Sequence, residues 1–330
     1  MLTIDYIGSK KSLLSEIDSE LESIGLNKSS RFGDLFAGTG IVSHFVSKKY
    51  GCKVLANDLL YYSYIISSAR LTKYSKIEVQ TINSIIDTLN RLPPVEGAVT
   101  KNFCPPSRMY FTSKNGKKID AVRQHIEQIK KDIPTKIFIY LLASLLSAAD
   151  YVSNTSAVYT TYLKKIKKKA RNPLLLKYID TTQIVPKSAT VHNTDASNIH
   201  THFDLVYLDP PYNDRHYSDH YHVMNTIALH NNFDLKGISG LPANIKELRS
   251  DYSRKKKVAE LFNNLVKSIR TKHILLSYNN EGLMSLDTIL NILNKYGETS
   301  VRIIPYKKFK SHPIPDKHLV TEYLIQCKKY

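Results

Sequence analysis

The segment from Asp204 to Tyr212 constrains the fold of this chain most strongly, because it combines a short apolar run with an abrupt stop. Residues 205–208 are apolar and favour a β-strand, and an aspartate and two prolines follow immediately. Proline cannot donate a backbone hydrogen bond, so the pattern predicts a buried strand that ends at the edge of a sheet. Ligands of open α/β sheets bind just outside the carboxyl ends of the strands, which places Asp209 in a predicted site.

The residues that follow this strand predict the kind of ligand. Pro210 and Pro211 contribute carbonyl oxygens on a stiff backbone, the carboxylate of Asp209 adds further acceptors, and Tyr212 supplies a flat ring. Acceptors for the hydrogens of an amino group, beside a ring that can stack, suit a planar amino-heterocycle such as adenine. A strand followed by a simple proline turn is the alternative, and the other motifs of the chain argue against it.

A glycine-rich loop lies upstream, between a predicted strand at 31–34 and a predicted helix that begins at Ile41. The loop reads Leu-Phe-Ala-Gly-Thr-Gly, so Phe36, Gly38 and Gly40 follow the carboxyl end of the strand. Two glycines at this spacing let the backbone turn sharply and approach a ligand closely. By itself the glycine pair also fits an ordinary strand-to-helix turn.

Aspartates lie at the carboxyl ends of three predicted strands, where a carboxylate can contact a ligand. Asp34 ends the first strand and is placed to bind a charged amine. Asp58 follows the second strand, 18 residues after Gly40, which is close to the spacing at which an acid contacts a ribose hydroxyl in dinucleotide folds. A surface aspartate is the alternative. Asp195 follows a strand predicted at 189–192, and it either binds the adenine of a cofactor or caps the next turn.

The amino-terminal residues from Tyr6 to Lys10 precede a predicted amphipathic helix, in which apolar residues recur at helical spacing. Ile7, Gly8 and Ser9 predict a tight loop before it. Lys10 is then expected near the first turn of the helix, where anions are also favoured. A terminal turn without a ligand fits these residues equally well.

The balance of charge favours a polyanionic partner. The chain holds 47 Lys and Arg residues against 29 Asp and Glu residues, which gives a net charge of +18. The alternation of strands and helices stops over 95–187, where helices are predicted at 119–132 and 135–149, and this segment alone carries 17 basic and six acidic residues. Its basic run at 164–171 comes soon after three tyrosines, Tyr151, Tyr159 and Tyr162. Because this combination suits phosphate contacts and base stacking, we predict that the segment recognises nucleic acid, with a solvated helix face as the alternative.

Strands predicted at 274–279, 301–305 and 319–326 complete the sheet. Three histidines follow Tyr212 and raise the possibility of a metal site, His216, His220 and His222. No acid or cysteine completes a ligand set with them at helical spacing, so we predict no metal and expect this loop to contact substrate.

The cellular compartment is predicted from what the sequence lacks. Cys52, Cys104 and Cys327 lie far apart and are interpreted as reduced cytosolic thiols. The longest apolar run, at 137–149, is too short to span a bilayer, and the first residues lack the features of a signal peptide. We therefore expect a cytoplasmic protein without a membrane partner.

In their order along the chain, these motifs resemble the alpha-group, Dam-like, S-adenosylmethionine-dependent DNA adenine-N6 methyltransferases. The resemblance covers nearly the whole length: the amino-terminal cofactor motif at 6–10, the glycine loop at 34–40, the acid Asp58, and the catalytic motif at 209–212. It implies an α/β fold with a Rossmann-like seven-stranded sheet whose last strand is antiparallel. It also implies a catalytic domain in two parts, 1–94 and 188–330, with a mainly helical target-recognition domain inserted at 95–187.

The resemblance further implies S-adenosylmethionine as cofactor and transfer of its methyl group to N6 of a flipped-out adenine in duplex DNA. Asp34 would hold the methionine amino group, Lys10 the methionine carboxylate side, and Asp58 the ribose. The catalytic residues would be Asp209, Pro210, Pro211 and Tyr212. The cofactor-binding residues would be Tyr6, Ile7, Gly8, Ser9, Lys10, Asp34, Phe36, Gly38, Gly40, Asp58 and Asp195.

The loop after Tyr212 is similar to members of restriction–modification systems, which implies a prokaryotic or phage context and a separately encoded restriction endonuclease as partner. An RNA adenine-N6 methyltransferase would use the same chemistry. A non-catalytic DNA-binding protein with this fold is a further alternative, although the intact Asp209, Gly38 and Asp58 argue against it. Amino-cytosine methyltransferases more often carry serine in place of Asp209, and dinucleotide oxidoreductases do not require Asp-Pro-Pro-Tyr.

Overall fold

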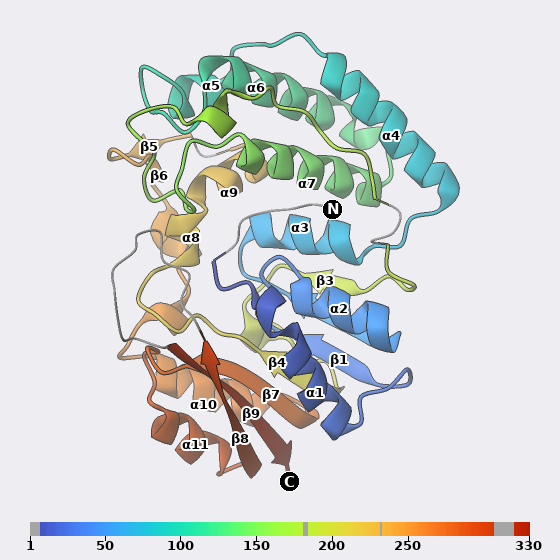
Figure 1. The fold of residues 1–330 in the computed structure, drawn as a ribbon, viewed down its shortest axis with the longest axis vertical. Helices are drawn as coiled ribbons and strands as arrows, with labels where there is room; N and C mark the ends of the chain where they lie inside the picture. The colour runs from blue at the N-terminus through green and yellow to red at the C-terminus, as the bar shows by residue number, and fades with distance from the viewer. Residues whose placement is uncertain (1–6, 181–183, 232, 307–319) are drawn as a thin grey trace. The chain divides into compact units, whose positions relative to one another are not determined.

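The computed structural model describes residues 7–180, 184–231, 233–306 and 320–330. The chain divides into two compact units, coloured along the sequence in Figure 1. Unit 1 takes Met1–Gly8, Leu60–Ser188 and Ser218–Leu248, and unit 2 takes Ser9–Leu59, Ala189–Tyr217 and Arg249–Tyr330.

Unit 2 is built on a seven-stranded sheet with the order β3-β2-β1-β4-β7-β9-β8. Its strands are β1 (Arg31–Asp34), β2 (Lys53–Asn57), β3 (Thr190–His192), β4 (Phe203–Leu208), β7 (Thr271–Asn279), β8 (Gly297–Tyr306) and β9 (Val320–Lys329). The pairs from β3 to β7 are all parallel, whereas β9 runs antiparallel to both of its neighbours. The predicted α/β fold with an antiparallel last strand is therefore confirmed. Leu319, the predicted first residue of that strand, lies outside the described residues.

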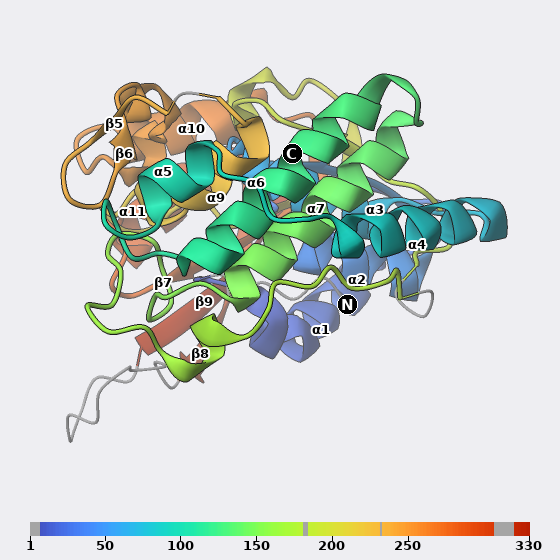
Figure 2. The ribbon, with the colours of Figure 1, turned by 90° about the horizontal axis from the view of Figure 1, so that it is seen from above.

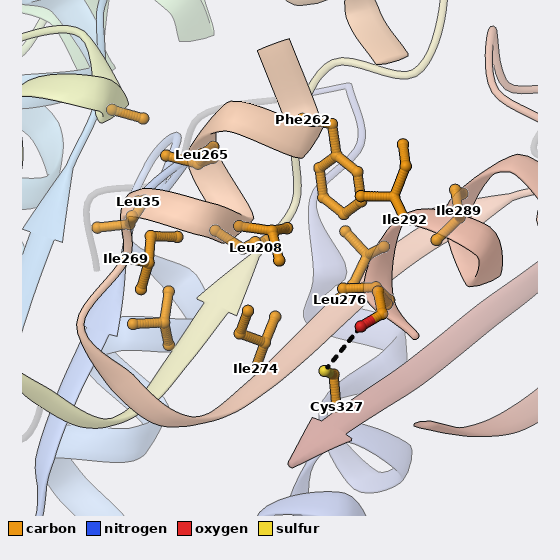
Figure 3. Close-up of a cluster of buried hydrophobic side chains, with 14 of the residues drawn as sticks. Leu35, Leu208, Phe262, Leu265, Ile269, Ile274, Leu276, Ile289, Ile292 and Cys327 are labelled. Atoms are coloured by element: carbon orange, nitrogen blue, oxygen red, sulfur yellow. Dashed lines mark hydrogen bonds between the residues drawn. The ribbon is translucent and has the colours of Figure 1, made fainter. Parts of the chain in front are cut away.

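Helices cover both faces of this sheet, which explains why neighbouring residues of β4, from Leu205 to Leu208, are all buried although they point to opposite faces. On one face, η1 (Lys10–Leu13), α1 (Leu14–Ile24) and α2 (Ile41–Tyr50) pack against side chains of β4 such as Leu205. On the other face, α10 (Val258–Ser268) and α11 (Leu286–Leu293) pack against alternate residues of the same strand, Val206 and Leu208. Figure 3 shows the second of these clusters, including Phe262, and the thiol of Cys327 that donates to the carbonyl of Leu293 over 3.8 Å.

Unit 1 is mainly helical and contains α3 (Tyr61–Leu71), α4 (Lys76–Arg91), α5 (Ala98–Phe103), α6 (Ser113–Gln128), α7 (Thr135–Tyr151), α8 (Tyr217–His220, whose first residue belongs to unit 2) and α9 (His222–Leu229). The nearly all-apolar α7 forms its centre and contacts α3, α4, α6 and α9. Figures 1 and 2 both show α6 and α7 side by side. A short hairpin of β5 (Leu235–Lys236) and β6 (Leu241–Pro242) follows α9.

The helices predicted at 119–132 and 135–149 correspond to α6 with the short η2 (Ile129–Lys131), and to α7. The basic run at 164–171 contains only one helical turn, η3 (Lys168–Arg171), and the chain on either side of it is irregular, so the alternative of a solvated helix face does not describe most of it. Unit 1 also includes α3, α4 and the segment Ser218–Leu248, because their apolar faces pack on α7 and its neighbours. Its limits thus differ from the predicted insertion at 95–187, whose recognition function stays a prediction.

Within the described ranges, no helix is both long and apolar enough to cross a membrane.

Phe262 belongs to the cluster in Figure 3, and its replacement tests how much this packing stabilises unit 2. Its side chain is fully buried on α10 among aliphatic residues of the sheet. We expect Phe262→Ala to lower the free energy of unfolding by about 3–5 kcal/mol, because it removes buried apolar surface and leaves a cavity. Urea denaturation followed by circular dichroism measures the loss. Phe262→Leu, which fills most of the space, is expected to cost much less, and equal losses for the two variants would contradict this packing.

Candidate active site

The predicted site residues of unit 2 meet at the carboxyl ends of three neighbouring strands. β1 ends at Asp34, β4 ends just before Asp209, and β2 lies on the other side of β1. Backbone hydrogen bonds join these ends: the amide of Leu35 donates to the carbonyl of Tyr207 over 3.3 Å, and the amide of Ala37 donates to the carbonyl of Asn57 over 2.9 Å. The glycine loop and the Asp-Pro-Pro-Tyr corner therefore share one edge of the sheet.

The glycine loop closes against the second acid. Gly38 and Gly40 have φ angles of 52° and 73°, in the left-handed region that favours glycine. The amide of Gly38 donates to Oδ2 of Asp58 over 2.9 Å. The side chain of Asn57, which the sequence analysis did not single out, donates to the carbonyls of Leu35 and Thr194 and so fixes the base of the loop.

Asp34 is buried and only partly satisfied. Its Oδ2 accepts a hydrogen bond from the hydroxyl of Ser43 on α2 over 2.7 Å. No group within the described part of the chain donates to its buried Oδ1. Burial raises the pKa of Asp34 to about 7, the negative charges of Asp209 and Asp58 add to this, and the hydrogen bond from Ser43 opposes it. A buried carboxylate oxygen without a donor suits a cationic ligand group.

Asp209 belongs to a buried triad of charged groups. The ammonium of Lys10 lies 3.1 Å from Oδ1 of Asp209 and 2.9 Å from Oε1 of Glu322 on β9. Burial raises the pKa of Asp209 to about 6, Lys10 opposes this shift, and Glu322 adds to it. Burial disfavours the charge of Lys10, but the two carboxylates overcome this and raise the pKa of its ammonium well above the usual value.

The corner after β4 is anchored to the segment that follows β7. The carbonyl of Tyr212 accepts a hydrogen bond from the amide of Leu283 over 2.8 Å. Its half-buried ring meets the ring of Tyr278 edge to face, with 6.2 Å between centroids, and the Lys10 ammonium lies 5.4 Å from its centroid. Pro210 is buried and Pro211 is partly exposed. The arrangement leaves a partly exposed ring beside an acidic group.

Two other predicted cofactor-binding residues, Phe36 and Asp195, contact neighbouring parts of unit 2. Phe36 packs edge to face on Tyr252, with ring centroids 5.0 Å apart. Oδ1 of Asp195 accepts hydrogen bonds from the amide and hydroxyl of Ser197, so this aspartate caps the next turn, η5 (Ala196–Asn198), as one of its two alternatives proposed. Whether Asp195 also contacts a cofactor stays a prediction.

The amino-terminal motif is divided between the units. The amide of Ile7 donates to the hydroxyl of Tyr221 over 2.7 Å within unit 1, and Gly8 has a φ of 78°. Ser9 precedes η1 in unit 2. Tyr6 lies outside the described residues.

Glu322 is the functional candidate that sequence reasoning missed. The sequence pattern around Glu322 predicts only a strand. In the structure Glu322 shares a face of β9 with the buried Leu324, two positions away. A charged residue on the buried face of a strand is a signal that sequence alone could have supplied. Its partner Lys10, more than 300 residues away in the chain, could not have been found in that way.

The basic run of unit 1 forms an exposed surface. Lys164, Lys165 and Lys168 are exposed and form no ion pair with any described carboxylate. The ammonium of Lys169 lies 4.6 Å from the ring centroid of Tyr151, which is 45% exposed. Tyr151 is thus available to a ligand in this unit.

The other two tyrosines before the run are packed inside unit 1. Tyr159 is fully buried, and its hydroxyl donates to Asp150 over 2.7 Å, so it cannot stack on a base. Tyr162 is partly buried against Tyr110, with ring centroids 5.1 Å apart.

Of the three histidines after the corner, His222 is held by the backbone of unit 1. The ring nitrogens of His222 lie 2.9 Å from the carbonyl of Asp219 and 2.8 Å from that of Ser239. Among the residues that the structure describes, no group of three or more His, Cys, Asp or Glu side chains is arranged to hold a metal ion.

Comparison with known proteins gives a consistent set of relatives. The model of the family described as D12 class N6 adenine-specific DNA methyltransferase matches residues 6–292. The Type II methyltransferase M.NlaIII of Neisseria lactamica is 38% identical over 93% of this chain and 93% of its own length. The Type II methyltransferase M.CviAII of Paramecium bursaria Chlorella virus 1 is 36% identical over 98% of each chain. The Type II methyltransferase M.FokI of Planomicrobium okeanokoites is 35% identical over 98% of this chain and 52% of its own length.

The raised pKa of Asp34 predicts how stability depends on pH. Between the ordinary value of 3.8 and about 7, the folded protein keeps a proton that the unfolded chain has lost, so the free energy of unfolding falls as pH rises through this window. Asp34→Asn removes this dependence, and we expect the variant to be more stable than the wild type at pH 7.5, by up to about 4 kcal/mol. Urea denaturation between pH 4 and 8 checks this. The exposed Asp132→Asn is the control, and parallel pH curves for wild type and Asp34→Asn would contradict the assignment.

Proposed function

Since the chain belongs to the D12 class N6 adenine-specific DNA methyltransferases, we propose that Asp209 and the corner up to Tyr212 hold an adenine rotated out of duplex DNA, and that unit 2 methylates its N6 atom from S-adenosylmethionine. One observation carries this proposal: the partly exposed carboxylate of Asp209 lies at the same sheet edge as the buried, half-satisfied carboxylate of Asp34. Asp209 would accept hydrogens from the adenine amino group that is methylated, and Asp34 would bind the ammonium group of the cofactor.

The residues around the glycine loop fit the cofactor. Oδ1 of Asp34 is a buried acceptor without a donor in the described chain, which suits the methionine ammonium. Gly38 and Gly40 let the backbone approach closely, and Asp58 lies beside them for the ribose hydroxyls. When bound, S-adenosylmethionine supplies an electrophilic methyl group on a sulfonium. An ammonium beside Asp34 would favour its ionised form, so binding is coupled to loss of the proton that Asp34 holds.

Asp209 and Pro210 would act on the adenine by accepting its two amino hydrogens. Base extrusion costs a few kcal/mol, and stacking on Tyr212 offsets part of it. With both hydrogens held by the Asp209 carboxylate and the Pro210 carbonyl, the N6 lone pair is drawn out of conjugation with the ring. The lone pair would then be free to form the new carbon–nitrogen bond, the sulfur of the cofactor would keep the electron pair of the broken bond, and N6 would release one proton to water. Positioning and electrostatic stabilisation of the positive charge on N6 supply the acceleration.

Unit 1 would bind the DNA through its basic surface. Lys164, Lys165 and Lys168 are exposed and suited to phosphate contacts, and Tyr151 offers an exposed ring. The relatives named Type II methyltransferases support a further proposal. The chain would belong to a restriction–modification system in the cytoplasm of its host, and its methyl group would protect DNA from a separately encoded endonuclease.

Replacement of the catalytic carboxylate tests the proposed reaction. Asp209→Ala is expected to lower the rate of methyl transfer about a thousandfold or more, because N6 loses its charged acceptor. Transfer of labelled methyl groups to duplex DNA measures the rate, and calorimetry with S-adenosylmethionine checks that cofactor binding persists. Lys10 keeps Glu322 as a partner in this variant. Methyl transfer near the wild-type rate would refute the proposal. Preferred methylation of RNA over duplex DNA in a competition assay would show that RNA is the substrate.

A charge-removal series tests the proposed DNA surface. Neutralising Lys164, Lys165 and Lys168 with glutamine is expected to weaken DNA binding and to reduce the slope of log K against log salt by up to about 2.7, since each lost phosphate contact removes about 0.9. Fluorescence anisotropy at several salt concentrations measures this. The matched control replaces three exposed lysines of unit 2, Lys28, Lys53 and Lys295. An unchanged slope in the first variant would show that the run is only a solvated surface.

A further inference from the structure

We propose that Glu322 is a positioning residue for methyl transfer, which binds the Lys10 ammonium together with Asp209 and thereby keeps the Asp209 carboxylate available to the adenine amino group. The inference rests on the proposed function of Asp209. It concerns a residue of the last strand, far in sequence from the other residues of the site.

The geometry separates the group that can reach substrate from the groups that support it. Lys10 and Glu322 each keep only 6% of their side-chain surface exposed, whereas Asp209 keeps 16%. Oδ1 of Asp209 is buried and lies 3.1 Å from the Lys10 ammonium, so the exposed part of the Asp209 side chain lies away from that oxygen. Oδ2 is therefore the oxygen that an adenine amino group can reach. Glu322 shares the Lys10 ammonium with Asp209, and its negative charge also acts directly on the Asp209 carboxylate.

The hydroxyl of Ser277 on β7 holds Glu322 in place. It donates to Oε1 of Glu322 over 2.7 Å, and the same oxygen lies 2.9 Å from the Lys10 ammonium. β7 and β9 are paired antiparallel along this stretch, with Asn279 opposite Glu322. The carboxylate of Glu322 is thus fixed by a rigid sheet, and it fixes the ammonium in turn.

The charge of the triad explains why two carboxylates are useful. A buried ammonium paired with Asp209 alone would form a neutral pair, and its donors would compete with the adenine for the acceptor. With Glu322 present, one positive and two negative groups leave one net negative charge beside the reacting nitrogen. That charge strengthens the hydrogen bonds from the adenine amino group in the ground state. It also stabilises the positive charge that develops on N6 as the carbon–nitrogen bond forms.

The ionisation of Asp209 is expected to determine how the rate of methyl transfer falls at low pH. The charged and titratable groups that act on Asp209 are Lys10, Glu322, Asp34 and the phenol of Tyr207. Burial, with Glu322, brings the pKa of Asp209 to about 6, and Lys10 opposes them. Protonation removes the negative charge of Asp209 and turns one of its two acceptor oxygens into a donor, so kcat/KM of the wild type is expected to fall as pH decreases through about 6. Loss of the negative charge of Glu322 lowers the pKa of Asp209, which moves this limb to lower pH.

The test is Glu322→Gln, which keeps the size of the side chain and an oxygen for Lys10 but removes the charge. We expect kcat/KM for duplex DNA to fall on the order of tenfold at pH 8, and the acid limb of its pH profile to move to lower pH. A purely structural function of Glu322 would change the rate without moving the limb. The matched control is Glu298→Gln, an exposed glutamate on the neighbouring strand β8, which should leave both quantities unchanged.

A second variant keeps the test decisive if Glu322→Gln folds poorly. Glu322→Asp retains the charge, so its acid limb should stay near the wild-type position even where the rate falls. Circular dichroism and calorimetry with S-adenosylmethionine verify that each variant is folded. An unmoved limb in folded Glu322→Gln, or a limb in Glu322→Asp that lies well below the wild-type position, overturns the inference. The Asp209→Ala variant separates this inference from the proposed function. If Asp209→Ala is inactive, the proposed function holds even where the inference about Glu322 fails. If Asp209→Ala is active, the proposed function itself is refuted.

Discussion

The buried ammonium of Lys10 is the interaction on which the site depends. Removing a charged group from water costs several kcal/mol, and the cost is recovered only when partners of opposite charge surround it. Asp209 at the end of β4 and Glu322 on β9 supply these partners. The ion triad therefore ties the first helical turn of unit 2, the corner that follows β4 and the last strand of the sheet into one arrangement.

The sheet concentrates negative charge where the ligands are expected to bind. β1 and β4 are parallel neighbours, so Asp34 and Asp209 meet at the same edge although 174 residues separate them in sequence. Burial and mutual repulsion raise the pKa of Asp34. The ionised form of such a carboxylate is unfavourable until a cation lies beside it. This property suits a site that binds a cofactor with an ammonium group. Part of the folding stability of unit 2 is exchanged for binding capacity at this position.

Unit 1 is stabilised in a different way, by the packing of helices on one another. Its stability comes from α7, whose apolar side chains are covered by helices from separated parts of the chain. This packing leaves the basic run at 164–171 on an irregular, exposed segment, where lysines can reach a polyanion. The tyrosines near the run divide by burial: Tyr159 supports the interior through Asp150, and Tyr151 stays at the surface.

The sequence by itself determined the local features of this protein. The apolar run before Asp209, the glycine pair at 38–40 and the acids after the strands predicted the sheet, its ligand-binding edge and a planar amino-heterocycle as ligand, because strand ends and tight turns depend on neighbouring residues. Methyl transfer was implied by the family resemblance. Only the tertiary structure decided how distant charges combine. Lys10 lies between Asp209 and Glu322, because the fold of the sheet, and no local pattern, brings these residues together, and its contact with the cofactor stays a prediction. Long-range contacts of this kind have no sequence period, which is also why the packing of α3 and α4 on α7 escaped prediction.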